Sequence, residues 1–348
     1  MKVLSLFDGI SCGRIALERA GIPVDVYFAS EIDKTAITIT KYHYPDTIEL
    51  GNVCDISYKD GILTAGDMQY ETDIDILIGG SPCTNLSFIG TKAGFTTGDE
   101  EILTLDRYLE LKEAGEQFSG QSYLFWEYLR ILKEVKPKYF LLENVKMAEK
   151  WEDIITRELG VKPIKINSSL LSAQNRPRLY WTNIPGVDIP KDKGIVIDDI
   201  LDKDPDVSDV SYTETVQKAL PIIHDHYGYL PERFNAYNVS RIKDKARALT
   251  AGGSPITSTC ATLMFVKVPE GVHEVKDGIM DGKYRVRFED GRYNIRKLSE
   301  SEMERLQTLP EGYTAVQGVS DNRRRHAIGN GWTVDVIAYI MSFIPSCD

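Results

Sequence analysis

Ile74-Asp75-Ile76-Leu77-Ile78-Gly79-Gly80-Ser81-Pro82-Cys83 is a short apolar run that ends in two glycines and a thiol. A run of this length and composition predicts a buried strand. Further along, Tyr139-Phe140-Leu141-Leu142 predicts a second strand, which ends in Glu143-Asn144-Val145. Ligands of open α/β sheets collect outside the carboxyl ends of the strands. We therefore expect the Cys83 thiol and the Glu143 carboxylate at the same edge of one sheet.

Each of these two residues has an ordinary interpretation when it is taken alone. A buried cysteine is usually an inert apolar residue, and a glutamate at a strand end is usually solvated. Together they suit one chemistry, in which a thiolate adds to C6 of a pyrimidine while an acid supports N3 and C5 becomes electron-rich. Other motifs must decide between the two interpretations.

The first half of the chain alternates strand-like and helix-like segments. Apolar runs predict strands, and helical periodicity predicts the helices between them. The expected strands are 3–7, 24–29, 74–78 and 138–142, and the expected helices are 13–19, 34–42 and 122–133. This order predicts an α/β fold with a doubly wound, mostly parallel sheet.

The alternation ends after Pro185-Gly186. Asp, Pro and Lys are frequent over 188–209, and no regular periodicity follows until about residue 292. Helical patterns resume over 298–306, and 329–343 predicts a final helix that returns to the first domain. We therefore expect two domains. The first comprises 1–187 and 325–348, and the smaller, irregular one comprises 188–324.

Composition and charge limit the class of protein. The 348 residues can bury a full core, no apolar run approaches the roughly 18 residues of a membrane span, and the N-terminus does not resemble a signal peptide. Five scattered cysteines lack zinc-site spacing, so we expect no metal and a reducing, cytoplasmic location. The net charge of −11 argues mildly against a nucleic-acid partner, although basic clusters occur at 241–247, 285–287 and 323–326.

A glycine turn joins the first expected strand to the first helix. The turn lets a ligand approach the backbone at a helix N-terminus, and its expected cofactor-binding residues are Phe7, Asp8, Gly9, Ile10 and Ser11. The Glu31 carboxylate, which Ile32 follows, suits contact with two ribose hydroxyls. The Asp55 carboxylate can accept a hydrogen bond from an adenine amine, and the following Ile56 can pack on the adenine ring. Because no P-loop lysine follows, S-adenosylmethionine fits better than a dinucleotide. A flavodoxin-like or NAD domain is the alternative.

The order of these motifs resembles the DNA (cytosine-5) methyltransferase family over nearly the whole chain. Gln174-Asn175-Arg176-Pro177-Arg178 resembles the family's Q-x-R-x-R motif, 296–310 resembles the motif that supports the recognition domain, and Gly329-Asn330-Gly331 resembles the closing motif. Phe7-Asp8-Gly9-Ile10 and Trp332 look most like the animal de novo branch and its phage and bacterial relatives.

Three residues depart from the commoner bacterial pattern of that family. Thr84 stands where glutamine usually follows the nucleophile, and Ser11 and Cys12 replace two glycines of the first turn. These changes affect no catalytic residue, but they weaken any transfer of loop details.

The resemblance implies a class I methyltransferase fold that uses S-adenosylmethionine, releases S-adenosylhomocysteine and acts on a cytosine flipped out of duplex DNA. Cys83 would attack C6, and Glu143 would bond N3 and the exocyclic amine. Arg176 would bind the cytosine carbonyl or a nearby phosphate, and Arg178 would hold Glu143 or the nucleophile loop. The cofactor site would be completed by Pro82, Asn330 and Trp332.

The resemblance also implies how double-stranded DNA is held. The glycine-rich segment 87–120 would close over the DNA, and the segment 191–292 would recognise the target. The expected DNA-binding residues are Ser87, Lys92, Arg241, Lys243, Lys245, Arg247 and Thr250. An accompanying restriction enzyme is a compatible partner, and the sequence leaves the oligomeric state open.

Three rival functions stay open on the sequence. A tRNA cytosine-5 methyltransferase shares the fold and the nucleophile, but its Cys-Phe-Thr signature is not found. A catalytically silent DNA-binding partner is disfavoured by the intact Pro82-Cys83, Glu143 and Arg176. An amine-directed methyltransferase would need an Asp- or Asn-Pro-Pro-aromatic motif where Ser81-Pro82-Cys83 stands.

Overall fold

The computed structural model describes residues 1–82, 95–96, 100–203, 208–251 and 255–345. The chain divides into two compact units. Unit 1 comprises Met1–Asn167, Pro177–Lys191 and Val334–Asp348, and unit 2 comprises Ser168–Arg176 and Asp192–Thr333. Each unit is therefore assembled from segments that are distant in the sequence.

Unit 1 is built on a seven-stranded sheet with the strand order β3-β2-β1-β7-β8-β11-β9. Its strands are β1 (Lys2–Leu6), β2 (Val26–Ser30), β3 (Ile48–Glu49), β7 (Ile76–Gly79), β8 (Tyr139–Val145), β9 (Ile164–Asn167) and β11 (Pro177–Thr182). The strands from β3 to β8 pair in parallel, and β11 runs antiparallel between β8 and β9. The doubly wound, mostly parallel sheet predicted from the sequence is confirmed.

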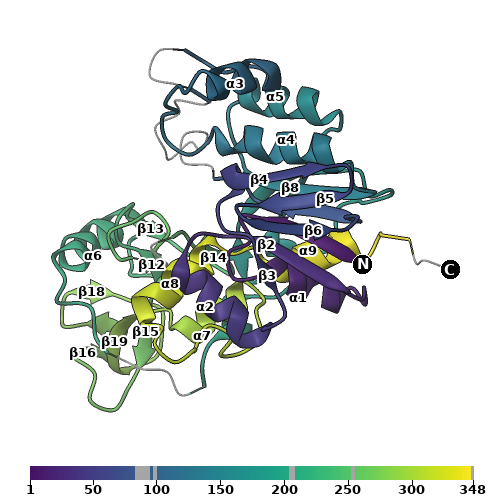
Figure 1. Cartoon of the computed structure of the whole chain (residues 1–348). Helices are drawn as coiled ribbons and strands as arrows, with labels where there is room; N and C mark the ends of the chain where they lie inside the picture. Colours follow the sequence, from purple (N-terminus) through teal and green to yellow (C-terminus); the bar gives the residue numbers. More distant parts are fainter. Residues whose placement is uncertain (83–94, 97–99, 204–207, 252–254, 346–348) are drawn as a thin grey trace. The chain divides into compact units, whose positions relative to one another are not determined.

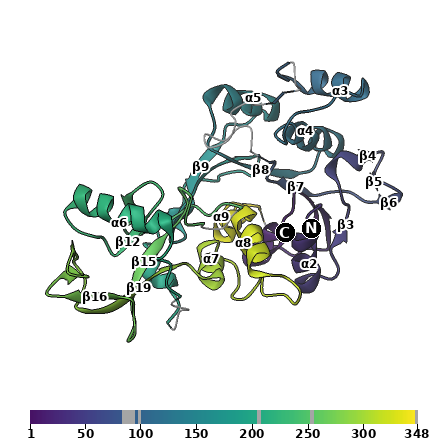
Figure 2. The ribbon, with the colours of Figure 1, turned by 90° about the vertical axis from the view of Figure 1, so that its left-hand side faces the viewer.

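Helices cover both faces of this sheet (Figure 1). α1 (Cys12–Arg19), α2 (Lys34–His43) and α9 (Val334–Met341) lie on one face, and α3 (Leu105–Glu113), α4 (Leu124–Val135) and α5 (Glu149–Leu159) lie on the other. Figure 2 shows β9, β8, β7 and β3 in the order of the sheet, below α5 and α4. Trp126 and Tyr128 of α4 are fully buried, so the apolar side of this helix fills the space above the strands.

Close packing explains the glycine at the end of β7. A Cβ atom on Gly79 would lie 2.9 Å from the carbonyl oxygen of Leu6 on β1 and 3.1 Å from the Tyr128 ring. A side chain at this position would push β7 away from its neighbours. Glycine at position 79 therefore allows the end of β7 to pack closely against β1 and α4, immediately before the segment that leads to Cys83.

Several elements differ from the sequence-based expectation, which included no strand at β3, β9 or β11 and no helix at α3 or α5. β4 (Ile56–Lys59), β5 (Ile62–Ala65) and β6 (Met68–Glu71) form a separate three-stranded antiparallel sheet that the sequence pattern did not reveal. The single final helix expected over 329–343 is wrong. Gly331 is extended (ψ 163°), so α8 (Asp321–Asn330) ends there and α9 begins at Val334.

Unit 2 contains a second seven-stranded sheet, which is antiparallel throughout, with the order β13-β12-β15-β19-β16-β17-β18. Its strands are β12 (Arg233–Asn235), β13 (Ser240–Arg241), β15 (Leu263–Lys267), β16 (His273–Lys276), β17 (Ile279–Met280), β18 (Tyr284–Arg285) and β19 (Gly291–Lys297). α6 (Glu214–Tyr227) and α7 (Glu300–Leu306) belong to the same unit, as does the short pair β10 (Gln174–Asn175) and β14 (Ala246–Arg247). The segment expected to be irregular therefore contains a regular sheet of mostly short strands.

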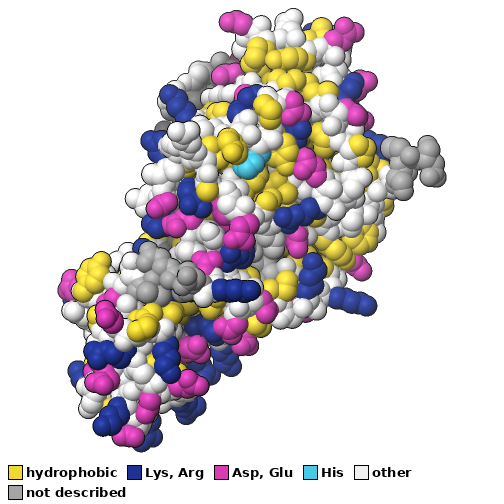
Figure 3. All heavy atoms as spheres, turned by 90° about the horizontal axis from the view of Figure 1, so that it is seen from below, with side chains coloured by type: hydrophobic (Ala, Val, Ile, Leu, Met, Phe, Trp, Pro, Cys, Tyr) yellow, Lys and Arg dark blue, Asp and Glu magenta, His cyan; other side chains and the backbone are white. Residues whose placement is uncertain are grey.

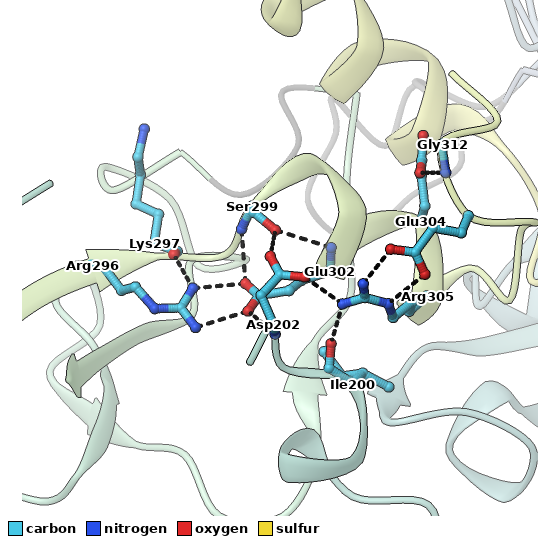
Figure 4. Close-up of polar contacts among 10 residues, drawn as sticks. Ile200, Asp202, Arg296, Lys297, Ser299, Glu302, Glu304, Arg305 and Gly312 are labelled. Atoms are coloured by element: carbon cyan, nitrogen blue, oxygen red, sulfur yellow. Dashed lines mark hydrogen bonds and ion pairs between the residues drawn. The ribbon is translucent and has the colours of Figure 1, made fainter. Parts of the chain in front are cut away.

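A buried ion pair joins β19 to α7 within unit 2 (Figure 4). The guanidinium of Arg296 donates two hydrogen bonds, of 2.7 and 2.8 Å, to the carboxylate of Glu302. Ser299 caps α7, since its hydroxyl accepts from the Glu302 amide and its own amide donates back to the Glu302 carboxylate. Asp202 connects to the same cluster through its amide, which donates to Glu302, and its carboxylate, which accepts from Arg305.

In the described ranges, no helix is long and apolar enough to cross a membrane. The same ranges hold no group of three or more His, Cys, Asp or Glu side chains placed to bind a metal ion.

Candidate active site

The segment that leads to Cys83 is anchored to β8. Gly79 of β7 pairs with Leu142 of β8, so both strands end at the same edge of the sheet. The side-chain nitrogen Nδ2 of Asn144 donates to the carbonyl oxygen (3.3 Å) and the hydroxyl (3.1 Å) of Ser81, and both residues are buried. Cys83 itself lies outside the described residues, as do Ser87, Lys92 and the positions 87–94 and 97–99 of the expected lid.

Glu143 and Arg178 form a shielded ion pair within unit 1. The antiparallel register of β8 and β11 places Tyr180 opposite Glu143 and Arg178 opposite Val145. Nε of Arg178 lies 2.9 Å from Oε1 of Glu143, and the two side chains are only 15% and 11% exposed. A second guanidinium nitrogen of Arg178 donates to the carbonyl of Pro177. The carboxylate therefore has a fixed orientation and a cationic neighbour in a poorly solvated place.

Arg176 belongs to unit 2 and is 5% exposed. Its guanidinium donates to the carbonyl oxygens of Leu249 (2.6 Å), Gly331 (3.1 Å) and Gly329 (3.3 Å). The neighbouring Gln174 accepts a hydrogen bond from the Leu249 amide, and its own amide donates to the Leu306 carbonyl. These contacts hold the Arg176 guanidinium within unit 2, and its contact with the cytosine carbonyl or a nearby phosphate stays a prediction.

The glycine turn has an unusual backbone. Phe7, Gly9 and Ser11 all have positive φ angles, between 55° and 62°. Such conformations are rare for residues other than glycine and concentrate at binding sites. Glu31 holds the turn, because its carboxylate accepts hydrogen bonds from the amides of Gly9 (2.8 Å), Ile32 and Asp33.

Some side chains of the glycine turn and of the end of β2 point into unit 1, and others are exposed to solvent. The carboxylate of Asp8 accepts from the hydroxyls of Ser11 (2.6 Å) and Tyr27 (2.7 Å), and burial raises the pKa of Asp8. Ile10 is buried, whereas Ile32 is 70% exposed. Asp8 therefore braces the turn from inside, and Ile32 offers an exposed apolar surface next to Glu31.

The third strand connection departs from the simple expectation. Asp55 is exposed, but Ile56 is 1% exposed and lies in the hydrophobic core. The Ser30 hydroxyl donates to the Gly51 carbonyl, so the exposed Asn52 follows a residue that is bonded to the end of β2, and Asp55 lies three residues further on. Sequence reasoning missed Asn52; its position three residues after the third strand was the available signal.

Glu49 is a second residue that the sequence did not single out. It ends β3 and pairs with Ala29 of β2, and both of its carboxylate oxygens are buried without a hydrogen-bond partner among the described residues. Burial, reinforced by the charge of Asp8, raises the pKa of Glu49 from 4.5 to about 7. Unit 1 therefore holds a carboxyl group whose buried oxygens have no hydrogen-bond partner among the described residues.

Glu49→Gln is expected to stabilise the cofactor-free protein by about 1 kcal/mol at pH 8 and to change its stability little at pH 5. The raised pKa means that the folded protein holds this proton more tightly than the unfolded chain, so wild-type stability falls as the pH rises from 4.5 to about 7. Solvent screening of a half-buried group keeps the effect small. Urea denaturation at both pH values measures it, and equal stabilisation at pH 5 and pH 8 would contradict it.

Three further residues were predicted from the sequence to bind the cofactor, namely Asn330 and Trp332 of unit 2 and Pro82 of unit 1. Asn330 is exposed at the end of α8, and Trp332 is half-buried two residues later. Gly329 packs so closely that a Cβ would overlap the Thr250 carbonyl at 1.7 Å, which ties α8 to the segment 249–250. Pro82, in unit 1, is half-buried.

A cavity of about 270 Å³ is lined by Ser169, Asn175, Arg241, Ile242, Lys243, Asp244, Lys245 and Arg247. Lys243 is exposed, but the ammonium of Lys245 donates to the carbonyl oxygens of Ser169, Ser172 and Ile195. Lys245 is thus engaged inside the unit, which favours an internal role over the phosphate contact predicted from the sequence.

Known proteins resemble the chain over almost its entire length. The family model described as C-5 cytosine-specific DNA methylase matches residues 1–156 and 166–346. A Type II methyltransferase of Neisseria lactamica, M.NlaX, is 28% identical and covers 97% of this chain and 94% of its own length. Another, M1.ScrFI of Lactococcus lactis subsp. cremoris, is 27% identical and covers 97% and 76%. The solved structure of the Entamoeba histolytica methyltransferase EhMeth shares the fold, with a TM-score of 0.63, 14% identity, and coverage of 99% of this chain and 97% of that one.

Proposed function

The chain belongs to the C-5 cytosine-specific DNA methylase family and is a DNA cytosine-5 methyltransferase, and from this premise we propose which residues carry the reaction. Cys83 is the nucleophile, Glu143 is the acid that supports the base, and Arg178 orients Glu143. The observation that supports this assignment most directly is the shielded Glu143–Arg178 pair at the end of β8, beside the buried Ser81 that precedes Cys83.

The proposed reaction begins when the Cys83 thiolate adds to C6 of a flipped cytosine. Glu143 bonds N3 and the exocyclic amine, which stabilises the charge that develops in the ring. S-adenosylmethionine, when bound, supplies the methyl group that the electron-rich C5 accepts. The C5 proton then leaves to water, and elimination of the Cys83 thiolate restores the ring as 5-methylcytosine.

The residues around the glycine turn fit this cofactor. The strained turn at Phe7 to Ser11 exposes backbone near the edge of the sheet, and the exposed Ile32 can cover an adenine ring. The unpartnered carboxylate of Glu49 suits a cationic group of the ligand. Glu31, Asn52 and Asp55 are the polar side chains proposed to bind its ribose and adenine.

The division of labour between the units is also a proposal. Unit 1 carries methyl transfer, and unit 2 carries recognition of double-stranded DNA, with Arg176 as a positioning residue. The named relatives are Type II methyltransferases of bacteria, so an accompanying restriction enzyme and a cytoplasmic location belong to the same proposal.

Incubation with S-adenosylmethionine labelled in the methyl group, and with either duplex DNA or tRNA, tests the proposed substrate. We expect label in DNA that comigrates with 5-methylcytosine after hydrolysis to nucleosides. Label in tRNA alone would support the rival tRNA enzyme, and binding of DNA without any transfer would support the silent partner.

Arg178→Lys is expected to lower kcat for DNA methylation by about 10²-fold, with little change in KM for S-adenosylmethionine. Lysine keeps the charge but cannot reproduce the Nε contact with Glu143 while also donating to the Pro177 carbonyl. Steady-state kinetics measures the split between kcat and KM. Arg157→Lys is the matched control, because Arg157 pairs with Glu158 on the exposed side of the same unit. A wild-type kcat in Arg178→Lys would refute the orienting role.

A further inference from the structure

Two arginines of unit 2 are stacked on tyrosines that lie close together in the sequence. The guanidinium carbon of Arg287 lies 3.9 Å from the centre of the Tyr229 ring. The guanidinium of Arg241 lies 5.5 Å from the centre of the Tyr227 ring, and it donates a hydrogen bond to the Tyr229 hydroxyl at 3.4 Å. Tyr229 therefore contacts both arginines, and we name Tyr227, Tyr229, Arg241 and Arg287 the arginine clamp.

The backbone holds the three segments of the clamp together. Tyr227 is the last residue of α6, Arg241 lies in β13, and Arg287 follows β18. The Leu230 amide donates to the Arg285 carbonyl at 2.8 Å, and Leu230 forms a β-bridge with Val286. The Arg241 amide donates to the Tyr227 hydroxyl. The arginines are thus brought together by the fold and not by sequence proximity.

The charges of the clamp are not neutralised within the chain. Both arginines are exposed, and neither has an ion-pair partner in the part of the chain that the structure describes. Three other arginines of unit 2 are paired, Arg233 with Asp198, Arg305 with Asp202 and Arg325 with Glu300. Arg241 and Arg287 differ from these three, because their unpaired guanidinium groups lie over tyrosine rings in a chain of net charge −11.

Charges of both signs are mixed on the face of the molecule that Figure 3 draws. Figure 3 shows Lys and Arg side chains interspersed with Asp and Glu over the face that it draws. The side chains coloured on that face therefore form no broad basic surface for DNA. A small number of well-oriented cations must then contribute more binding free energy per residue. Stacking on a tyrosine fixes the plane of a guanidinium and leaves its N–H edge free to donate.

We propose that the arginine clamp binds the phosphate backbone of duplex DNA, with Arg287 as a contact that lies outside the basic segment 241–247. This assignment rests on the proposed function, because it takes DNA as the substrate. Phosphate is the expected acceptor, since phosphate and sugar receive most protein–DNA hydrogen bonds and a stacked arginine presents two parallel donors to one anion.

The salt dependence of DNA binding tests the clamp. A fluorescent duplex of random sequence is titrated with the full-length wild type and with Arg287→Gln, Arg241→Gln and the double variant over a series of salt concentrations. The slope of log affinity against log salt is expected to shrink by about 1 for each single variant and by about 2 for the double variant. Arg287→Lys keeps the charge and should keep the slope, so it separates lost charge from misfolding.

Lys218→Gln is the matched control, because Lys218 is an exposed cation of unit 2 that already pairs with Glu214 on α6. It should leave the slope unchanged. Methyl transfer to DNA by the wild type is measured on the same preparations. If the wild type methylates DNA but the clamp variants keep its slope, the clamp is overturned and the proposed function stands. A wild type that neither binds nor methylates DNA overturns both.

Discussion

Cys83→Ala is expected to lower methyl transfer to DNA by more than about 10⁴-fold, because no other step of the proposed reaction makes C5 nucleophilic. DNA binding should persist, since this variant removes no proposed phosphate contact. Duplex DNA that contains 5-fluorocytosine offers a direct measurement. Fluorine at C5 cannot leave as a proton does, so the wild type should remain covalently attached to the DNA after methyl transfer, whereas Cys83→Ala should form no adduct.

Cys260→Ala provides the control for this substitution. Cys260 is a buried cysteine of unit 2, far along the chain from the proposed nucleophile, and its replacement should preserve both transfer and adduct formation. An adduct that survives Cys83→Ala, or that disappears in Cys260→Ala, would require a different nucleophile.

The sheet of unit 1 could be predicted from the sequence because its signals are local. The runs that form β1, β7 and β8 are mostly apolar and buried, as expected for parallel strands covered by helices on both faces. The sheet of unit 2 has no such signal. Several of its strands have two residues, and its longest, β19, pairs with β15 and β16 across turns and loops. Pairing partners outside a strand, and not its own composition, determine such a sheet.

Side-chain partners in the site show the same limit. The family resemblance left open whether Arg178 holds Glu143 or the nucleophile loop, and the contact with Glu143 follows from the antiparallel register of β11 against β8. Lys245 looked like its basic neighbours Lys243 and Arg247, and only the fold shows that three carbonyl oxygens surround its ammonium. Arg287 belongs to the basic cluster at 285–287, and only the structure shows that its guanidinium lies over Tyr229. Residue type predicts which groups can do chemistry, and tertiary contacts decide which of them are available.

Glu302 lies at the centre of the most heavily bonded polar cluster described for unit 2. Its side chain is fully buried, and its carboxylate accepts two hydrogen bonds from Arg296 and one each from the amides of Ser299 and Asp202 (Figure 4). Loss of this carboxylate would leave the Arg296 guanidinium, itself 2% exposed, without its counter-ion. A buried charge stripped of its partner is costly, whereas replacing both members by apolar groups can be nearly neutral.

Glu302→Ala is therefore expected to lower the free energy of unfolding by about 3–5 kcal/mol, and the double variant Arg296→Met/Glu302→Leu by much less. The destabilisation of Glu302→Ala beyond that of the double variant measures the cost of a buried Arg296 without a counter-ion, and not the loss of a contact as such. Urea denaturation followed by circular dichroism gives both values. Glu311→Ala, which removes an exposed carboxylate paired with Arg305, should change stability by less than about 1 kcal/mol. If the double variant is as unstable as Glu302→Ala, the cluster stabilises unit 2 through its hydrogen-bond network to Ser299 and Asp202, and not through charge compensation alone.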